Sequence, residues 1–246
     1  MTLEIRYLGW TAFELITSKG TRILLDPMLS GSDRDGIPPS PVQTHELLDI
    51  NLLMVTHAAA DHVGRAMEIL KDSSALLVCD PATRFLAASH GISENRIFRM
   101  VSGVRFKFDD IAVKALPAQH ISLARTDAGF AGGQPLSFII ETEDGEKVFF
   151  AGDTSIHSDL KLYGELYHPV IGMLGVGGVN VHGQSMTELH PDEAVLAAKW
   201  LGLEAAIPMH YRGNEGKDFV DELQKLAPNI KGILMKPGDR FIYPPE

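Results

Sequence analysis

The sequence predicts an α/β protein in which two mixed β-sheets are covered by helices. Three observations predict this class. Apolar strands alternate with helical segments, hairpin turns interrupt that alternation, and the 246 residues can bury a large core without disulfides. Hairpins together with helix crossovers argue against a purely parallel sheet. No linker or low-complexity tract divides the chain, so we expect residues 1–246 to form one domain.

The first half of the chain predicts a hairpin followed by strand–helix units. Leu3, Ile5 and Tyr7 alternate with polar residues, and Lys19-Gly20 predicts the turn between the next two strands. A stretch rich in Gly, Pro, Ser and Asp, residues 30–41, predicts a surface loop. The expected strands are 3–7, 12–17, 22–25, 52–55 and 76–78, and the expected helices are 63–70 and 81–89, the second beginning with proline.

The second half predicts more hairpins and then further strand–helix units. Val104, Phe106 and Phe108 alternate with charged residues, and Asp144-Gly145 is a strong hairpin turn. The expected strands are 104–108, 111–116, 137–142, 147–151, 170–174 and 205–209, with more between 230 and 243, and the expected helices are 191–201 and 217–226.

Composition limits the classes of function. The formal net charge of −10 disfavours nucleic-acid binding, because such a surface repels phosphate backbones. The chain begins without a signal-peptide pattern and has no apolar run long enough to span a membrane. Its one cysteine, Cys79, follows an apolar run, and we expect an inert buried thiol. We therefore expect a cytoplasmic protein that acts on a small molecule, with homo-oligomerisation left open.

Histidine and aspartate side chains recur just beyond the ends of four predicted strands. Each of them alone is more often a helix cap, a turn residue or a solvated side chain. Their repetition at strand ends favours a metal site, because such loops on a rigid scaffold can present converging ligands. Imidazole and carboxylate groups suit zinc, manganese or iron. The candidates are His57, Asp61 and His62 after strand 52–55, His120 after 111–116, Asp153 after 147–151, and His210 after 205–209.

Five short motifs give the chain a family resemblance over nearly its whole length. Together they resemble the metallo-β-lactamase superfamily and, within it, the metal-dependent hydrolases related to L-ascorbate-6-phosphate lactonase. The motifs are Tyr7-Leu8-Gly9 with Thr11-Ala12-Phe13, then Leu24-Leu25-Asp26-Pro27, Thr56-His57-Ala58-Ala59-Ala60-Asp61-His62, Gly152-Asp153-Thr154 with Ser158-Asp159, and Ile207-Pro208-Met209-His210-Tyr211.

The resemblance implies a four-layer αβ/βα sandwich with weak internal two-fold symmetry and a hydrolytic site at one edge. It implies one or two divalent ions, with zinc favoured and manganese or iron as alternatives, and water between them as the nucleophile. Asp153 would bridge the ions, and Asp61 would also orient the water or take a proton. Substrates would be lactones, phosphodiesters or related small esters. The implied ligands are His57, His120 and Asp153 at the first position, and Asp61, His62, His210 and Asp153 at the second.

Two positions depart from the family pattern. Ala59 stands where the second histidine of the His-x-His-x-Asp-His motif belongs, and Trp10 stands where close relatives often carry histidine. Three outcomes follow. The protein holds one metal, at the second position. Or it holds two, with the first bound weakly or rescued by His157 or His182. Or it has lost catalysis and remains a metal- or ligand-binding protein.

Two further features have alternative interpretations. Asp26 is either an orienting partner for a ligand imidazole or a turn residue before Pro27. Gly177-Gly178 forms either a plain turn or a loop whose backbone N–H groups face a substrate anion, and the turn is the simpler alternative.

Overall fold

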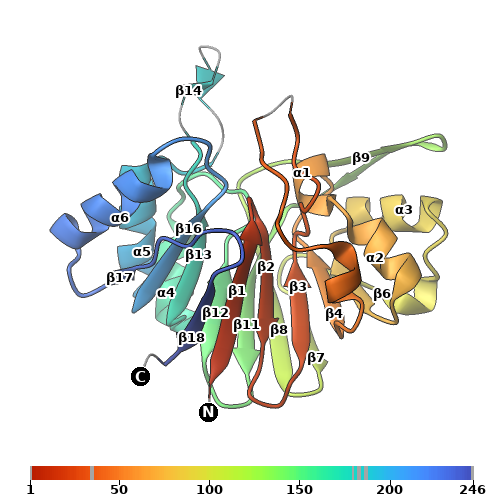
Figure 1. Ribbon diagram of the computed structural model, residues 1–246, viewed down its shortest axis with the longest axis horizontal. Helices are drawn as coiled ribbons and strands as arrows, with labels where there is room; N and C mark the ends of the chain where they lie inside the picture. Colours follow the sequence, from red (N-terminus) through yellow and green to blue (C-terminus); the bar gives the residue numbers. More distant parts are fainter. Residues whose placement is uncertain (1, 34–35, 179, 182–183, 186–187, 245–246) are drawn as a thin grey trace.

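Two seven-stranded sheets pack face to face, and helices cover their outer faces (Figure 1). The computed structural model describes residues 2–33, 36–178, 180–181, 184–185 and 188–244. Helices α2 and α3 lie beside the first sheet, and α4, α5 and α6 lie beside the second. The predicted four-layer αβ/βα sandwich is confirmed.

The first sheet has the strand order β18-β1-β2-β3-β4-β5-β6. Its strands are β1 (Leu3–Gly9), β2 (Ala12–Ile16), β3 (Arg22–Leu25), β4 (Leu52–Val55), β5 (Leu76–Cys79), β6 (Ile97–Arg99) and β18 (Arg240–Tyr243). The associated helices are α1 (Ala60–Val63), α2 (Ala66–Asp72) and α3 (Pro81–Ser89), with short 3-10 turns η1 (Thr44–Leu47) and η2 (Glu94–Arg96).

The second sheet has the order β17-β16-β13-β12-β11-β8-β7. Its strands are β7 (Arg105–Phe108), β8 (Ile111–Pro117), β11 (Leu136–Thr142), β12 (Lys147–Phe150), β13 (Ile171–Gly175), β16 (Ala205–Met209) and β17 (Lys231–Gly232). Its helices are α4 (Asp159–Tyr167), α5 (Pro191–Leu201) and α6 (Glu215–Leu226). Two small ribbons join β9 (Ser122–Thr126) to β10 (Gly129–Gly133) and β14 (Asn180–Val181) to β15 (Gln184–Ser185).

The internal two-fold symmetry that the resemblance implied is present in the strand connections. In the first sheet, β1, β2 and β3 are antiparallel, and β3 to β6 are parallel. In the second, β7, β8, β11 and β12 are antiparallel, and β12, β13, β16 and β17 are parallel. Carboxyl ends of parallel strands meet at one edge of a sheet. The loops after β4, β12 and β16 therefore lie at the edge drawn uppermost in Figure 1.

Aromatic side chains fill the space between the sheets. The rings of Phe13 on β2 and Phe150 on β12 meet edge to face, with centroids 6.2 Å apart. Phe138, which stands opposite Phe150 on the neighbouring strand β11, is fully buried beside them. Burying a phenylalanine side chain contributes about 1.5–3 kcal/mol, so this cluster is a main reason why the two sheets stay together. Cys79 is also buried, as expected of a core thiol.

The expected helix over residues 63–70 is wrong as one element, because the chain breaks it into α1 and α2. Gly64 has a φ of 42° at the break, in the left-handed region that glycine tolerates. A Cβ atom there would lie 2.2 Å from the carbonyl oxygen of Pro27, so the corner packs directly on the loop after β3. Helix α4 and the β9–β10 ribbon are elements that the sequence did not predict. Within the described parts of the chain, none of the helices has the length and apolarity that crossing a membrane requires.

Candidate metal centre

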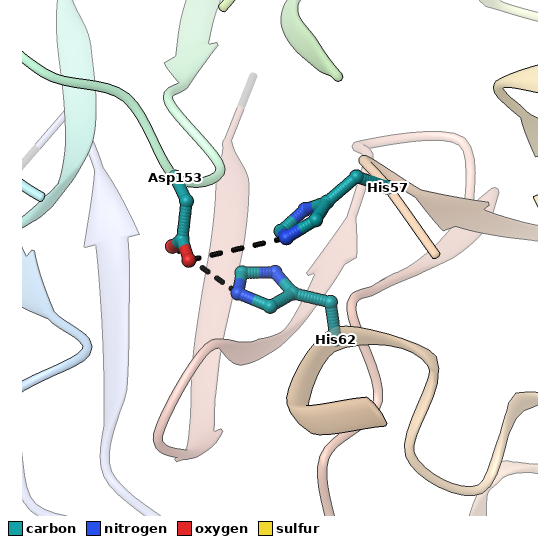
Figure 2. A group of neighbouring side chains, drawn as sticks. All are labelled: His57, His62 and Asp153. Carbon is teal, nitrogen blue, oxygen red and sulfur yellow. Dashed lines mark ion pairs between the residues drawn. The ribbon is translucent and has the colours of Figure 1, made fainter. Parts of the chain in front are cut away.

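The structure brings all six predicted site residues together at one edge of the sandwich. Figure 2 shows the centre of this group, where the rings of His57 and His62 approach the carboxylate of Asp153. The His62 Nε2 atom lies 3.1 Å from Asp153 Oδ1, and the His57 Nε2 atom lies 4.0 Å from Asp153 Oδ2. His57 lies in the loop after β4 and His62 in the following helix α1, whereas Asp153 lies in the loop after β12, a strand of the other sheet.

Asp153 is the common neighbour of the histidines. Its Oδ2 atom lies 3.4 Å from His210 Nε2 and 3.8 Å from His120 Nε2. The preceding glycine, Gly152, makes this approach possible, since it has a φ of 58° and a Cβ there would lie 2.8 Å from Thr56. Asp153 is 3% exposed, so its carboxylate is enclosed by the imidazoles that surround it.

Asp26 fixes the orientation of His62. Its Oδ2 atom lies 2.7 Å from His62 Nδ1 and accepts a hydrogen bond from the Thr56 hydroxyl at 2.7 Å. The Oδ1 atom accepts from the Thr56 backbone N–H at 2.8 Å. With Nδ1 bound to Asp26, the Nε2 atom of His62 faces Asp153. Asp26 therefore contacts a candidate ligand imidazole, as the first interpretation proposed, and it also has a left-handed φ of 39° before Pro27.

Asp61 is the most exposed of the candidate acids, with a side chain that is 33% exposed. Its Oδ2 atom lies 3.2 Å from His210 Nε2, and the indole N–H of Trp10 donates a hydrogen bond to the same oxygen at 3.2 Å. The Trp10 ring also packs against the His210 ring, with centroids 4.3 Å apart. Trp10 thus contacts two candidate ligands.

The charges at the centre stabilise the ionised carboxylates. Burial alone would raise the pKa of Asp153, but the neighbouring His210 and His62 lower it well below its ordinary value. Burial also opposes ionisation of Asp61, yet the hydrogen bond with His210 and the charge of His62 lower its pKa. Burial and the adjacent His62 lower the pKa of His57 to about 3, so this imidazole is neutral at pH 7. Ionised carboxylates and the neutral imidazole of His57 are forms that bind cations. Burial alone would lower the pKa of His62 and His210, but Asp153 and the other nearby carboxylates raise both pKa values, so these two imidazoles would release a proton when an ion binds.

Several buried polar atoms of the centre have no hydrogen-bond partner among the described residues. They are His57 Nε2, His62 Nε2, Asp153 Oδ1, His210 Nδ1 and Glu188 Oε2. The His62 Nε2 and Asp153 Oδ1 atoms are close, but they are not aligned as a hydrogen bond. Each unpaired buried group costs about 1–3 kcal/mol. A divalent cation would satisfy His57 Nε2, His62 Nε2 and Asp153 Oδ1, which meet in one donor group, so these residues fit a metal ion.

Glu188 is a member of the centre that the sequence analysis missed. Its side chain is buried, and one ligand atom each of Asp153, Glu188 and His210 lies within 4.8 Å of the others. Burial and the adjacent Asp153 raise the pKa of this carboxyl group. In two further groups the donor atoms also lie within 4.8 Å of one another. The first group is His57, His62 and Asp153, and the second is Asp61, His62 and His210.

Gly177 and Gly178 pack against the backbone of two residues of the centre, which neither the turn nor the anion-binding interpretation anticipated. A Cβ atom at Gly177 would lie 2.0 Å from the His210 carbonyl oxygen, and one at Gly178 would lie 2.0 Å from the Glu188 carbonyl oxygen. The glycines therefore let two site segments pack directly on the end of β13.

The structure shows the surroundings of Ala59, where the resemblance led us to expect a histidine. Ala59 is the residue before α1, and its carbonyl accepts hydrogen bonds from the backbone N–H groups of His62 and Val63. His157, one proposed substitute, packs its ring against Tyr163 with centroids 5.9 Å apart. It belongs to none of the donor groups found among the described residues. His182, the other, lies outside the described residues.

Comparison with known proteins identifies the family. Residues 21–211 match the model of the β-lactamase superfamily domain. A UPF0173 metal-dependent hydrolase of Methanobrevibacter smithii is 34% identical over 99% of this chain and 98% of its own length. One from Methanopyrus kandleri is 32% identical, covering 97% of this chain and 99% of its own.

A solved structure shows the same fold over the full length. Igni18, described as a novel metallo hydrolase from the hyperthermophilic archaeon Ignicoccus hospitalis, superposes with a TM-score of 0.82 at 25% identity and covers 100% of both chains. With a matching family model and curated relatives that align end to end, this chain belongs to the UPF0173 metal-dependent hydrolases of the β-lactamase superfamily.

Proposed function

We propose that this protein hydrolyses a small lactone, phosphodiester or related ester with water activated by one or two divalent metal ions. One observation carries the proposal: imidazole nitrogens and carboxylate oxygens converge at one edge of the sandwich, and several of these buried atoms lack partners in the described structure. Zinc suits this mixed set of nitrogen and oxygen donors, with manganese or iron as alternatives. The substrate would be a small cytoplasmic metabolite.

The proposed ligands keep the family assignment. His57, His120 and Asp153 would hold one ion, and Asp61, His62, His210 and Asp153 would hold the other. Divalent ions bound there would polarise a substrate oxygen and lower the pKa of water toward neutrality. Asp26 would keep the Nε2 atom of His62 directed at the ion through its contact with Nδ1.

Asp61 is well placed for proton handling. Its side chain combines partial exposure with a lowered pKa, so it is ionised at neutral pH and can be approached by substrate and water. Trp10 holds its Oδ2 atom, which leaves Oδ1 to orient an attacking water or accept its proton.

The position of Arg212 favours a substrate that carries a negative charge or gains one during the reaction. Its guanidinium carbon lies 5.0 Å from the centroid of the Trp10 ring, and its side chain is exposed. In a chain of net charge −10, a cation beside the Trp10 ring, which itself packs against His210, would favour an anionic substrate over a neutral one. Phosphodiesters and acidic lactones fit this requirement.

A substrate panel tests the proposal. Zinc-, manganese- and iron-loaded enzyme would be assayed with bis-p-nitrophenyl phosphate and with a series of lactones, beside Asp153→Ala prepared in the same way. We expect at least one substrate to be hydrolysed ~100-fold faster by the wild-type protein, because Asp153 would bind both proposed ions. Equal rates for the two proteins on every substrate would reject hydrolysis of these classes at this site.

A further inference from the structure

Glu188 reaches the metal centre from a segment that carries no metal-binding motif. It lies two residues before His190, the residue that precedes α5, and its side chain is only 4% exposed. One oxygen of its carboxylate lies within 4.8 Å of a donor atom of Asp153 and of a donor atom of His210, which are candidate ligands from two other loops. A buried glutamate at this place needs a partner of opposite charge, because an ionised carboxylate without one is strongly disfavoured in the interior.

The backbone around Glu188 holds the side chain in place. The Gly178 N–H donates to the Leu189 carbonyl at 3.1 Å, and Leu189 is fully buried. The close approach of Gly178 to the Glu188 carbonyl oxygen leaves no room for a side chain between them. This packing anchors the segment to the end of β13 on the side of the centre where His210 lies, so the position of the carboxylate is built into the fold.

One carboxylate oxygen of Glu188 is left without a hydrogen-bond partner among the described residues. This atom, Oε2, is buried, and the carboxylate of Asp153 and the imidazole of His210 both lie beside the Glu188 carboxylate. Two adjacent buried carboxyl groups repel one another unless they share a proton or a cation. His210 stands beside both, and its Nε2 atom lies 3.4 Å from Asp153 Oδ2.

We propose that Glu188 is a metal ligand in this chain, acting with Asp153 and His210 on an ion at the second position. This inference rests on the proposed function, since it assumes that the same centre binds divalent metal. Ala59 leaves the first position with His57, His120 and Asp153. Glu188 would bring the second position to five protein ligands. The chain would therefore bind one ion tightly at the second position and a further ion more weakly at the first.

Metal titration tests this assignment without relying on activity. Metal-free wild-type protein and Glu188→Gln would be titrated with zinc in competition with a chromophoric chelator. Glutamine keeps the size of the side chain and its hydrogen-bonding capacity but removes the charge. We expect the tight zinc site of Glu188→Gln to be weakened at least ~10-fold. The matched control, Glu165→Gln on the exposed face of α4, should bind zinc like the wild type.

A second variant separates the two positions. Ala59→His restores the missing imidazole at the first position, so it should strengthen the weaker zinc site and leave the tight one unchanged. A Glu188→Gln protein that binds zinc within twofold of the wild type would overturn the ligand assignment alone. A wild-type protein that binds no zinc, manganese or iron would overturn the proposed function as well.

A zinc-loaded crystal structure of the wild-type chain tests the same assignment without any variant. We expect a Glu188 carboxylate oxygen about 2.0–2.2 Å from an ion that also contacts His210. An ion bound to Asp153 and His210 with Glu188 outside bonding distance would overturn the inference.

Discussion

The indole N–H of Trp10 donates a hydrogen bond to the Asp61 carboxylate at 3.2 Å. The same ring packs on His210, and the Trp10 carbonyl accepts the His210 backbone N–H at 3.1 Å. Trp10 has a left-handed φ of 51°, an uncommon conformation for a bulky residue, and its side chain clusters with Met28 and Ile37. Trp10 thus connects the loop after β3 to Asp61 and His210, two of the proposed ligands at the second position.

Replacing Trp10 by phenylalanine removes this hydrogen bond but keeps an aromatic ring. We expect kcat/KM to fall about 10-fold, because Asp61 would lose its fixed orientation. Steady-state kinetics on the best panel substrate would measure the effect. Trp200→Phe on α5 makes the same chemical change away from the centre, and it should leave kcat/KM unchanged. Equal losses in the two variants would show that Trp10 acts on stability alone.

Asp26→Asn should weaken metal binding rather than abolish the fold. The amide keeps an acceptor for the Thr56 backbone N–H, but an NH₂ group cannot accept a hydrogen bond from His62 Nδ1. Loss of an orienting partner typically costs about 10–100-fold in metal affinity, and we expect a loss in that range by chelator competition.

Asp110→Asn is the matched control for Asp26→Asn. Asp110 is also buried and accepts hydrogen bonds from two hydroxyl groups, those of Thr17 and Thr21, but it lies on turns at the other end of the sheets. The Asp110→Asn variant should have a lower free energy of unfolding and an unchanged affinity for zinc. Unchanged zinc affinity in Asp26→Asn would contradict an orienting role for Asp26.

Gly64→Ala should be far more destabilising than an ordinary glycine substitution. The added Cβ would meet the Pro27 carbonyl oxygen at 2.2 Å in a left-handed conformation, so we expect a loss of about 3 kcal/mol or more in urea unfolding. Gly91→Ala also has a left-handed φ, of 81°, but its Cβ would enter open space and should cost only about 1 kcal/mol. Similar losses at the two positions would show that the contact between α1 and the loop after β3 is not tight.

Much of the centre could be predicted because its residues follow apolar strands. The segments before His57, Asp153 and His210 are β4, β12 and β16, and their apolar character is plain in the sequence. The pairing of these strands into two sheets then places the three loops at one edge.

The parts that were missed depend on contacts between distant segments. Glu188 follows no apolar strand and acquires its place only when Gly177-Gly178 packs against its backbone and that of His210. The break between α1 and α2 depends on Pro27, from another loop, occupying the space beside Gly64. The β9–β10 ribbon was missed because three of the five residues of β10 are glycines, which give no alternating pattern.

The metal content of the purified protein tests the central claim most directly. Wild-type protein and Asp153→Ala would be prepared without chelators or a metal-binding tag, and both would be measured by elemental analysis after soaking in zinc, manganese and iron. The account predicts at least one tightly held equivalent per chain in the wild type and a marked loss in Asp153→Ala. A wild-type protein that retains no metal, or an Asp153→Ala protein that retains as much as the wild type, would contradict it.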